Sequence, residues 1–75
     1  MTATKPPKKP VERRVWIKAQ LELRKSSFAE IARELGVSRQ TVRKALDMSY
    51  PKMERAIAVK LGMPPEAIWP ERYAA

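Results

Sequence analysis

The sequence has no cysteine and no histidine among its 75 residues. It therefore cannot form disulfides, thiolate metal sites or zinc fingers, and it has no imidazole for acid–base catalysis. Acidic residues are scarce, since 8 Asp and Glu stand against 16 Lys and Arg, which gives a formal net charge of +8. We find no nucleophile–base pair, and we expect a non-enzymatic protein without cofactor or metal. The excess of positive charge predicts a polyanionic partner, nucleic acid before an anionic membrane.

Long apolar runs are also lacking, and no segment approaches the roughly 20 residues that a membrane-spanning helix needs. The cationic residues do not oppose a continuous apolar face, which disfavours a helix lying on a membrane surface. A chain of 75 residues has room for one domain with a small core. We therefore expect a soluble, cytoplasmic protein of one domain, with no membrane partner.

The segment 27–46 has the pattern of a helix-turn-helix. A first helix is predicted over about Phe28–Leu35, because Ser27 and Glu30 can form a capping box at its start. Gly36 follows, where a helix end needs a residue that tolerates a left-handed backbone. Two helices joined by so short a turn cross closely, so a small residue is required between them. The predicted inward stripe of the first helix is Phe28, Ile31, Ala32 and Leu35.

The second helix of this motif is predicted over about Arg39–Asp47, after an N-cap at Ser38. Its inward stripe is Val42, Ala45 and Leu46. Arginine can pair with guanine and glutamine with adenine, so the outward side chains are predicted to contact bases: Arg39, Gln40, Arg43 and Lys44. Residues at helix starts, or beside the DNA groove that this helix would enter, are predicted to contact phosphates: Ser27, Ser38, Thr41, Ser49 and Lys52. The same spacing also fits an ordinary αα-hairpin whose arginines only solvate one face.

Residues 1–10 are rich in lysine and proline and have almost nothing to bury. We interpret them as a disordered basic arm and residues 11–75 as the DNA-binding domain. Lys5, Lys8 and Lys9 are candidate arm contacts to DNA, in a minor groove or along phosphates. A tail that only increases solubility explains the same composition.

The remaining helices are predicted from their spacing and their prolines. A helix from residue 11 or 12 to about residue 25 would face inward through Trp16, Ala19 and Leu23. Another is predicted over about Pro51–Leu61, with Gly62 as its C-terminal cap. A short turn over 65–68 follows, Pro70 prevents its continuation, and an apolar lid is predicted from Ile68, Trp69 and Tyr73. No strand is predicted, so the fold class is all-α, with four to five helices and no wing.

The end of the chain resembles a known family. The run Pro65-Glu66-Ala67-Ile68-Trp69-Pro70-Glu71-Arg72-Tyr73 is similar to the ending of the Ner proteins of Mu-like phages and their bacterial Ner-like (Nlp) relatives. Pro51-Lys52, Ile57-Ala58 and Ala45-Leu46 also resemble that family, so the similarity extends from about Ile17 to Tyr73. The basic, proline-rich start departs from the pattern. The recognition helix is also more basic, so no operator sequence can be carried over.

The resemblance implies a compact λ-repressor-like DNA-binding domain with a central helix-turn-helix. It also implies a phage or prophage transcriptional regulator that turns down early transcription, in the cytoplasm of a bacterial host and associated with its nucleoid. Our leading hypothesis is sequence-specific binding to double-stranded DNA, with a homodimer as the candidate assembly on DNA and repression by promoter occlusion. Two alternatives stay open: an architectural or recombination accessory protein, and an antitoxin-like protein-interaction module.

Overall fold

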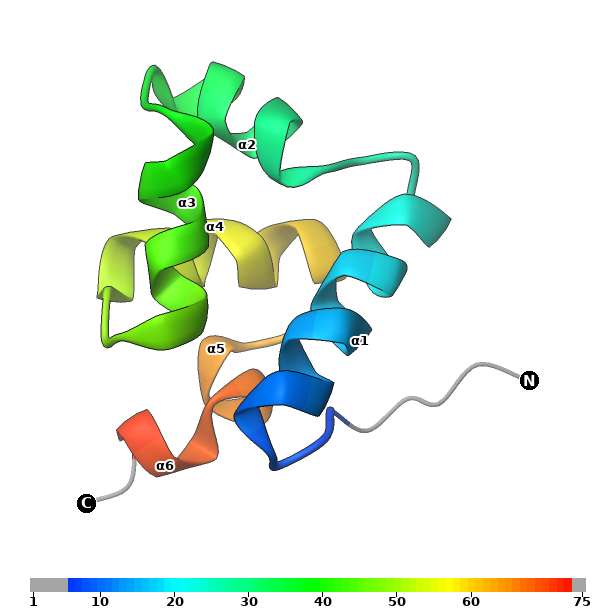
Figure 1. Ribbon diagram of the computed structural model, residues 1–75, viewed down its shortest axis with the longest axis vertical. Coiled ribbons are helices and arrows are strands. Elements are labelled where there is room, and N and C mark those ends of the chain that lie inside the picture. Colours follow the sequence, from blue (N-terminus) through cyan, green and yellow to red (C-terminus); the bar gives the residue numbers. More distant parts are fainter. Residues whose placement is uncertain (1–5, 74–75) are drawn as a thin grey trace.

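The computed structural model describes residues 6–73, and the regular structure in this range is entirely helical. The elements in order are α1 (Pro10–Leu23), α2 (Phe28–Leu35), α3 (Arg39–Asp47), α4 (Pro51–Leu61), α5 (Pro65–Ile68) and α6 (Pro70–Tyr73). In Figure 1, α2 lies across one end of the molecule, α1 and α3 stand on opposite sides, and α4 crosses between them. The short helices α5 and α6 close the other end. The all-α fold and the bounds predicted for α2, α3, α4 and α5 are confirmed.

Three helices end in the same hydrogen-bonded turn, in which one residue adopts the left-handed backbone. Gly36 and Gly62 take this role after α2 and α4, each with a φ of 70°, as predicted. The turn after α1 uses Lys25 instead, with a φ of 56°. There the amide of Ser26 donates to the carbonyl of Leu21 over 2.8 Å. Because this turn closes early, α1 ends at residue 23 and not at residue 25 as we predicted.

The core is assembled from five of the six helices, with α3 packed against both α2 and α4. Ile68 and Trp69 are fully buried members of the core, so this segment folds back onto the bundle as we predicted. Tyr73, the third member of the predicted lid, is partly exposed. The other buried hydrophobic side chains include Ile17, Leu21, Ile31, Ala32, Val42, Ala45, Leu46, Met53, Ile57, Ala58 and Leu61.

Our prediction for the inward face of α1 was wrong. Leu23 is 63 % exposed and Trp16 is only half-buried, whereas Ile17 and Leu21 enter the core. The buried side of α1 also carries Arg13, which is 3 % exposed, beside Gln20. A hydrophobic pattern cannot reveal a buried face that contains two polar residues. On α2, Leu35 is also more exposed than its predicted place in the inward stripe requires.

Arg13 can be buried because its guanidinium makes four hydrogen bonds within the protein. It donates to both carboxylate oxygens of Glu71, over 2.6 and 3.0 Å. It also donates to the backbone carbonyls of Pro7 and Lys8. Residues 7 and 8 of the predicted basic arm are therefore attached to α1 and α6, while residues 1–5 lie outside the described range.

A second buried charge, Glu54, connects α4 to the end of the chain. Its carboxylate is 1 % exposed and accepts from the backbone amide of Tyr50 over 2.6 Å. It also accepts from Arg72 over 3.0 Å and from the hydroxyl of Tyr73 over 2.7 Å. These donors come from α6, an element that we did not predict. Pro70 begins this helix, because proline lacks only an N–H that the first turn leaves unpaired.

Candidate nucleic-acid interface

The helix-turn-helix has the local structure that the sequence predicts. The Ser27 hydroxyl accepts from the amide of Glu30 over 3.1 Å, and the Ser38 hydroxyl accepts from the amide of Thr41 over 3.1 Å. The carboxylate of Glu30 does not complete a capping box, because both its oxygens accept from Arg33. This contact lowers the pKa of Glu30 below its ordinary value. Two side-chain caps and one left-handed glycine thus fix how α3 leaves α2.

The outward face of α3 consists of polar and basic side chains. Val42 and Ala45 are fully buried, whereas the four predicted base-contacting residues are all exposed: Arg39, Gln40, Arg43 and Lys44. Within residues 6–73, none of these cations forms an ion pair with a carboxylate. The face is therefore free to meet an external anion.

The predicted phosphate-contacting residues lie at the two ends of α3 and at the start of α2. Ser27 precedes α2, and Ser38 and Thr41 are at the beginning of α3, where their hydroxyls lie 2.9 Å apart. Ser49 and Lys52 are exposed in the connection to α4 and in its first turn. Of the predicted arm contacts, Lys8 and Lys9 are exposed immediately before α1, and Lys5 is outside the described residues.

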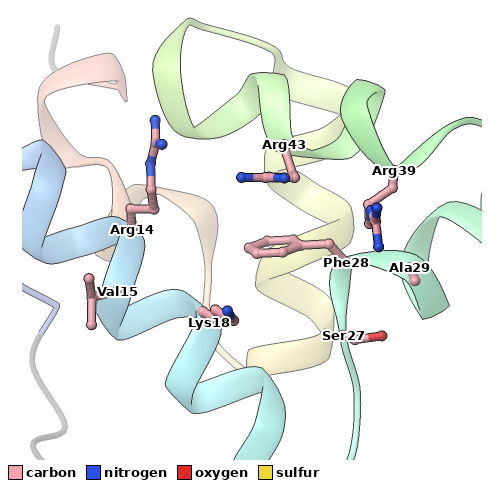
Figure 2. Close-up of a pocket in the computed structure, with 8 residues that line it drawn as sticks. All are labelled: Arg14, Val15, Lys18, Ser27, Phe28, Ala29, Arg39 and Arg43. Carbon is pink, nitrogen blue, oxygen red and sulfur yellow. The ribbon is translucent and has the colours of Figure 1, made fainter.

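A groove of about 620 Å³ separates α1 from the helix-turn-helix. Figure 2 shows Arg14 and Lys18 on α1, Arg39 and Arg43 on α3, and the ring of Phe28 between the two helices. Val15, Ser27 and Ala29 complete the lining. Arg14 and Lys18 are site residues that we did not predict, although their spacing of four places them on one face of a helix.

The ion pairs of the described residues leave most of this groove without negative charge. Arg14 pairs with Asp47 at the end of α3, and this is the one carboxylate that binds a groove cation in residues 6–73. The other pairs lie elsewhere and join Arg13 to Glu71, Arg33 to Glu30, Lys60 to Glu34 and Arg72 to Glu54. Four of the five ion pairs thus lie away from the groove, while three of its four cations have no carboxylate partner among the described residues.

The orientation of α3 depends on the end of the chain. Arg72 donates to the carbonyl of Ala45 over 2.5 Å, in the last turn of α3, where carbonyls lack a partner within the helix. The same guanidinium lies 5.4 Å from the ring centre of Trp69 and binds Glu54. Arg72 therefore connects α3 to α4 and to the core.

Among residues 6–73 there is no cluster of acidic side chains that could hold a metal ion. None of the helices in this range has the length and apolar character of a transmembrane segment.

Known proteins resemble this chain over most of its length. The family model described as winged helix-turn-helix DNA-binding matches residues 13–75. The negative regulator of transcription of Escherichia phage D108 is 49 % identical over 57 residues, which cover 76 % of this chain and 78 % of that protein. The Mu-like prophage FluMu DNA-binding protein Ner of Haemophilus influenzae is 44 % identical over 78 aligned positions, which cover 99 % of this chain and 86 % of that protein. Sugar fermentation stimulation protein B of Escherichia coli is 42 % identical over 55 residues, which cover 73 % of this chain and 60 % of that protein.

The family description mentions a wing, which is a β-hairpin beside the helix-turn-helix. Residues 6–73 contain no strand, and α4 follows α3 where a hairpin would begin. The absence of a wing predicted from the sequence is therefore confirmed for the described part of the chain.

Proposed function

Because the chain belongs to the Ner-like family of helix-turn-helix DNA-binding proteins, we propose that it is a negative regulator of transcription that binds a specific site on double-stranded DNA. The D108 relative is named a negative regulator of transcription, and the Haemophilus relative is named a DNA-binding protein. The family consists of regulators, in agreement with the expectation of a non-enzymatic protein.

The proposal is carried by the outer face of α3. A recognition helix must expose side chains that can reach base edges in the major groove while its inner face holds it to the domain. Arg43 lies one turn after Arg39 and Gln40, all three exposed, and the inner face is buried. We propose that these three residues and Lys44 contact bases. Ser27, Ser38, Thr41, Ser49 and Lys52 then contact phosphates on both sides of the groove.

Molecular dimensions support binding as a homodimer on DNA. The described residues have a longest extent of 32 Å. Helix-turn-helix dimers place their half-sites roughly 34 Å apart, one turn of the duplex. Two copies thus fit side by side on one face of DNA, each with an α3 in a successive major groove. A domain this small is proposed to repress by covering a promoter.

The decisive experiment is selection of bound duplexes from random DNA, followed by transcription from a promoter that carries the selected site. We expect a defined site with two related halves and a loss of transcripts that tracks its occupancy. Random, unenriched sequences would contradict specific binding. The name of one relative describes stimulation of sugar fermentation, so an increase in transcripts from the bound promoter would assign activation in place of repression.

Two variants divide base contacts from phosphate contacts. Arg43→Ala is expected to cost about 1–3 kcal/mol on the selected site and to relax the preference at one base position. Lys52→Ala is expected to weaken binding to all sequences about equally. The measurement is the affinity of each variant for the selected duplex and for a scrambled duplex at fixed salt. Equal losses on both duplexes for Arg43→Ala would make Arg43 a phosphate contact.

A further inference from the structure

The groove between α1 and the helix-turn-helix brings together four cations from two separate parts of the fold. Arg14 and Lys18 belong to α1, and Arg39 and Arg43 belong to α3 (Figure 2). Like charges that line one cleft repel each other, and an anion that enters the cleft relieves this repulsion. The base-contacting face of α3 accounts for two of these cations and leaves Arg14 and Lys18 without a role.

We propose that this groove binds the sugar-phosphate backbone of the DNA strand beside the bases that α3 reads, with Arg14 and Lys18 contacting its phosphates. The inference rests on the proposed function and extends the interface to a helix outside the helix-turn-helix. Lys18 is exposed and forms no ion pair within the described residues, so no carboxylate has to be displaced from it. The half-buried ring of Phe28 provides an apolar wall against which a deoxyribose can pack.

Asp47 acts as an intramolecular competitor at this site. It pairs with Arg14, which lines the groove, and the side chains of Asp47 and Arg14 are 64 % and 46 % exposed. Exposed pairs of this kind are weak, so a DNA phosphate can replace the carboxylate on Arg14. Asp47 also places a negative charge beside the incoming phosphates. Asp47 therefore lowers the affinity for every DNA sequence. Only a site whose bases make favourable contacts with α3 offsets this loss of affinity.

Lys18→Gln tests the groove, and Lys60→Gln is its matched control. Both remove one positive charge, but Lys60 lies outside the groove and binds Glu34 over 2.8 Å. We expect Lys18→Gln to weaken the selected and the scrambled duplex about equally. It should make the slope of log K against log salt shallower by about 0.9, which corresponds to about an eightfold loss of affinity at 0.1 M salt. Lys60→Gln should leave the slope unchanged.

Asp47→Asn tests the competitor, with Glu66→Gln as the matched control that removes one exposed negative charge from α5. We expect Asp47→Asn to raise the affinity for both duplexes by about two- to fivefold, on the scale of an exposed ion pair. This gain should shrink when Arg14→Gln is added, because the released partner is then missing. The Glu66→Gln protein should bind both duplexes as the parent does.

The outcomes separate this inference from the function on which it rests. If Lys18→Gln matches Lys60→Gln while Arg43→Ala still relaxes base preference, the groove does not bind the backbone and the proposed function stands. If Asp47→Asn gives no gain, the competitor role is wrong. If no duplex is selected at all, the proposed function fails first. Every substituted position is exposed except Lys60, which is partly exposed, and circular dichroism of each variant verifies that the helices are retained.

Discussion

Replacement of Glu54 by alanine is expected to remove a large part of the stability of this domain. The carboxylate is 1 % exposed and accepts three hydrogen bonds, one from the backbone amide of Tyr50 just before α4 and two from α6. Without it, the guanidinium of Arg72, whose side chain is 15 % exposed, is left without a carboxylate partner. Loss of one member of a buried ion pair costs about 3–5 kcal/mol. A domain of this size is stable by only roughly 4–11 kcal/mol.

Thermal and urea unfolding followed by circular dichroism measures this effect. At roughly 4–8 °C per kcal/mol, the midpoint temperature of Glu54→Ala should fall by at least about 12 °C. Glu66→Ala is the control, because Glu66 is exposed, and it should stay within about 0.5 kcal/mol of the parent. In the Glu54→Ala background, a further Arg72→Met change should cost less than it does in the parent, since the ion pair with Glu54 is already lost. A decrease of less than about 4 °C for Glu54→Ala would refute the reasoning.

Four further results are expected. Ala32→Leu should lose about 1–3 kcal/mol and bind DNA poorly, because Ala32 is 4 % exposed at the α2–α3 contact, and a fully stable variant would contradict that packing. Lys25→Gly should gain about 0.5–1 kcal/mol in urea unfolding, since its φ of 56° favours glycine, whereas Arg24→Gly should lose stability. The hydrogen bond from Arg13 lowers the pKa of Glu71 in the folded protein. The stabilisation from this bond is therefore complete above the pKa of Glu71 in the unfolded chain, near 4.5, and is lost as the pH falls through the lower pKa of the folded protein. The stability difference between the parent and Glu71→Gln should therefore disappear in acid. Finally, the log of DNA affinity should fall with log salt with a slope of about −4 to −5, if roughly five phosphates are neutralised, and a slope near zero would contradict an electrostatic interface.

The helix-turn-helix could be predicted from the sequence because its signals are local. Ser27, Gly36 and Ser38 each determine a helix end through contacts with residues at most four positions away. The inward stripe of α3 follows from the spacing of three apolar residues. These positions require no knowledge of the rest of the chain, and the bounds of α2 and α3 agree with the prediction.

The parts that sequence reasoning missed depend on distant partners. Arg13 is buried because Glu71 binds it, and these two residues are 58 positions apart. Glu54 is buried because Arg72 and Tyr73 reach it from α6. A charged residue normally predicts an exposed position, so the inward face of α1, which includes Arg13, could not be read from hydrophobic spacing.

The site itself was only partly predictable for a similar reason. The outward residues of α3 follow from the periodicity of one helix, and the structure exposes them. The role proposed for Arg14 and Lys18 depends on how α1 is placed opposite α3, which is a property of the tertiary fold. Whether these residues and the predicted base and phosphate contacts bind DNA stays a prediction.

The packing of residues 69–73 has a consequence for shortened forms of the domain. Trp69 is fully buried in the core, and Arg72 donates to the carbonyl of Ala45 in the last turn of α3, 27 positions earlier in the chain. A fragment that stops before residue 69 would keep every side chain that we predict to contact bases, yet it would lack the contacts that hold the last turn of α3.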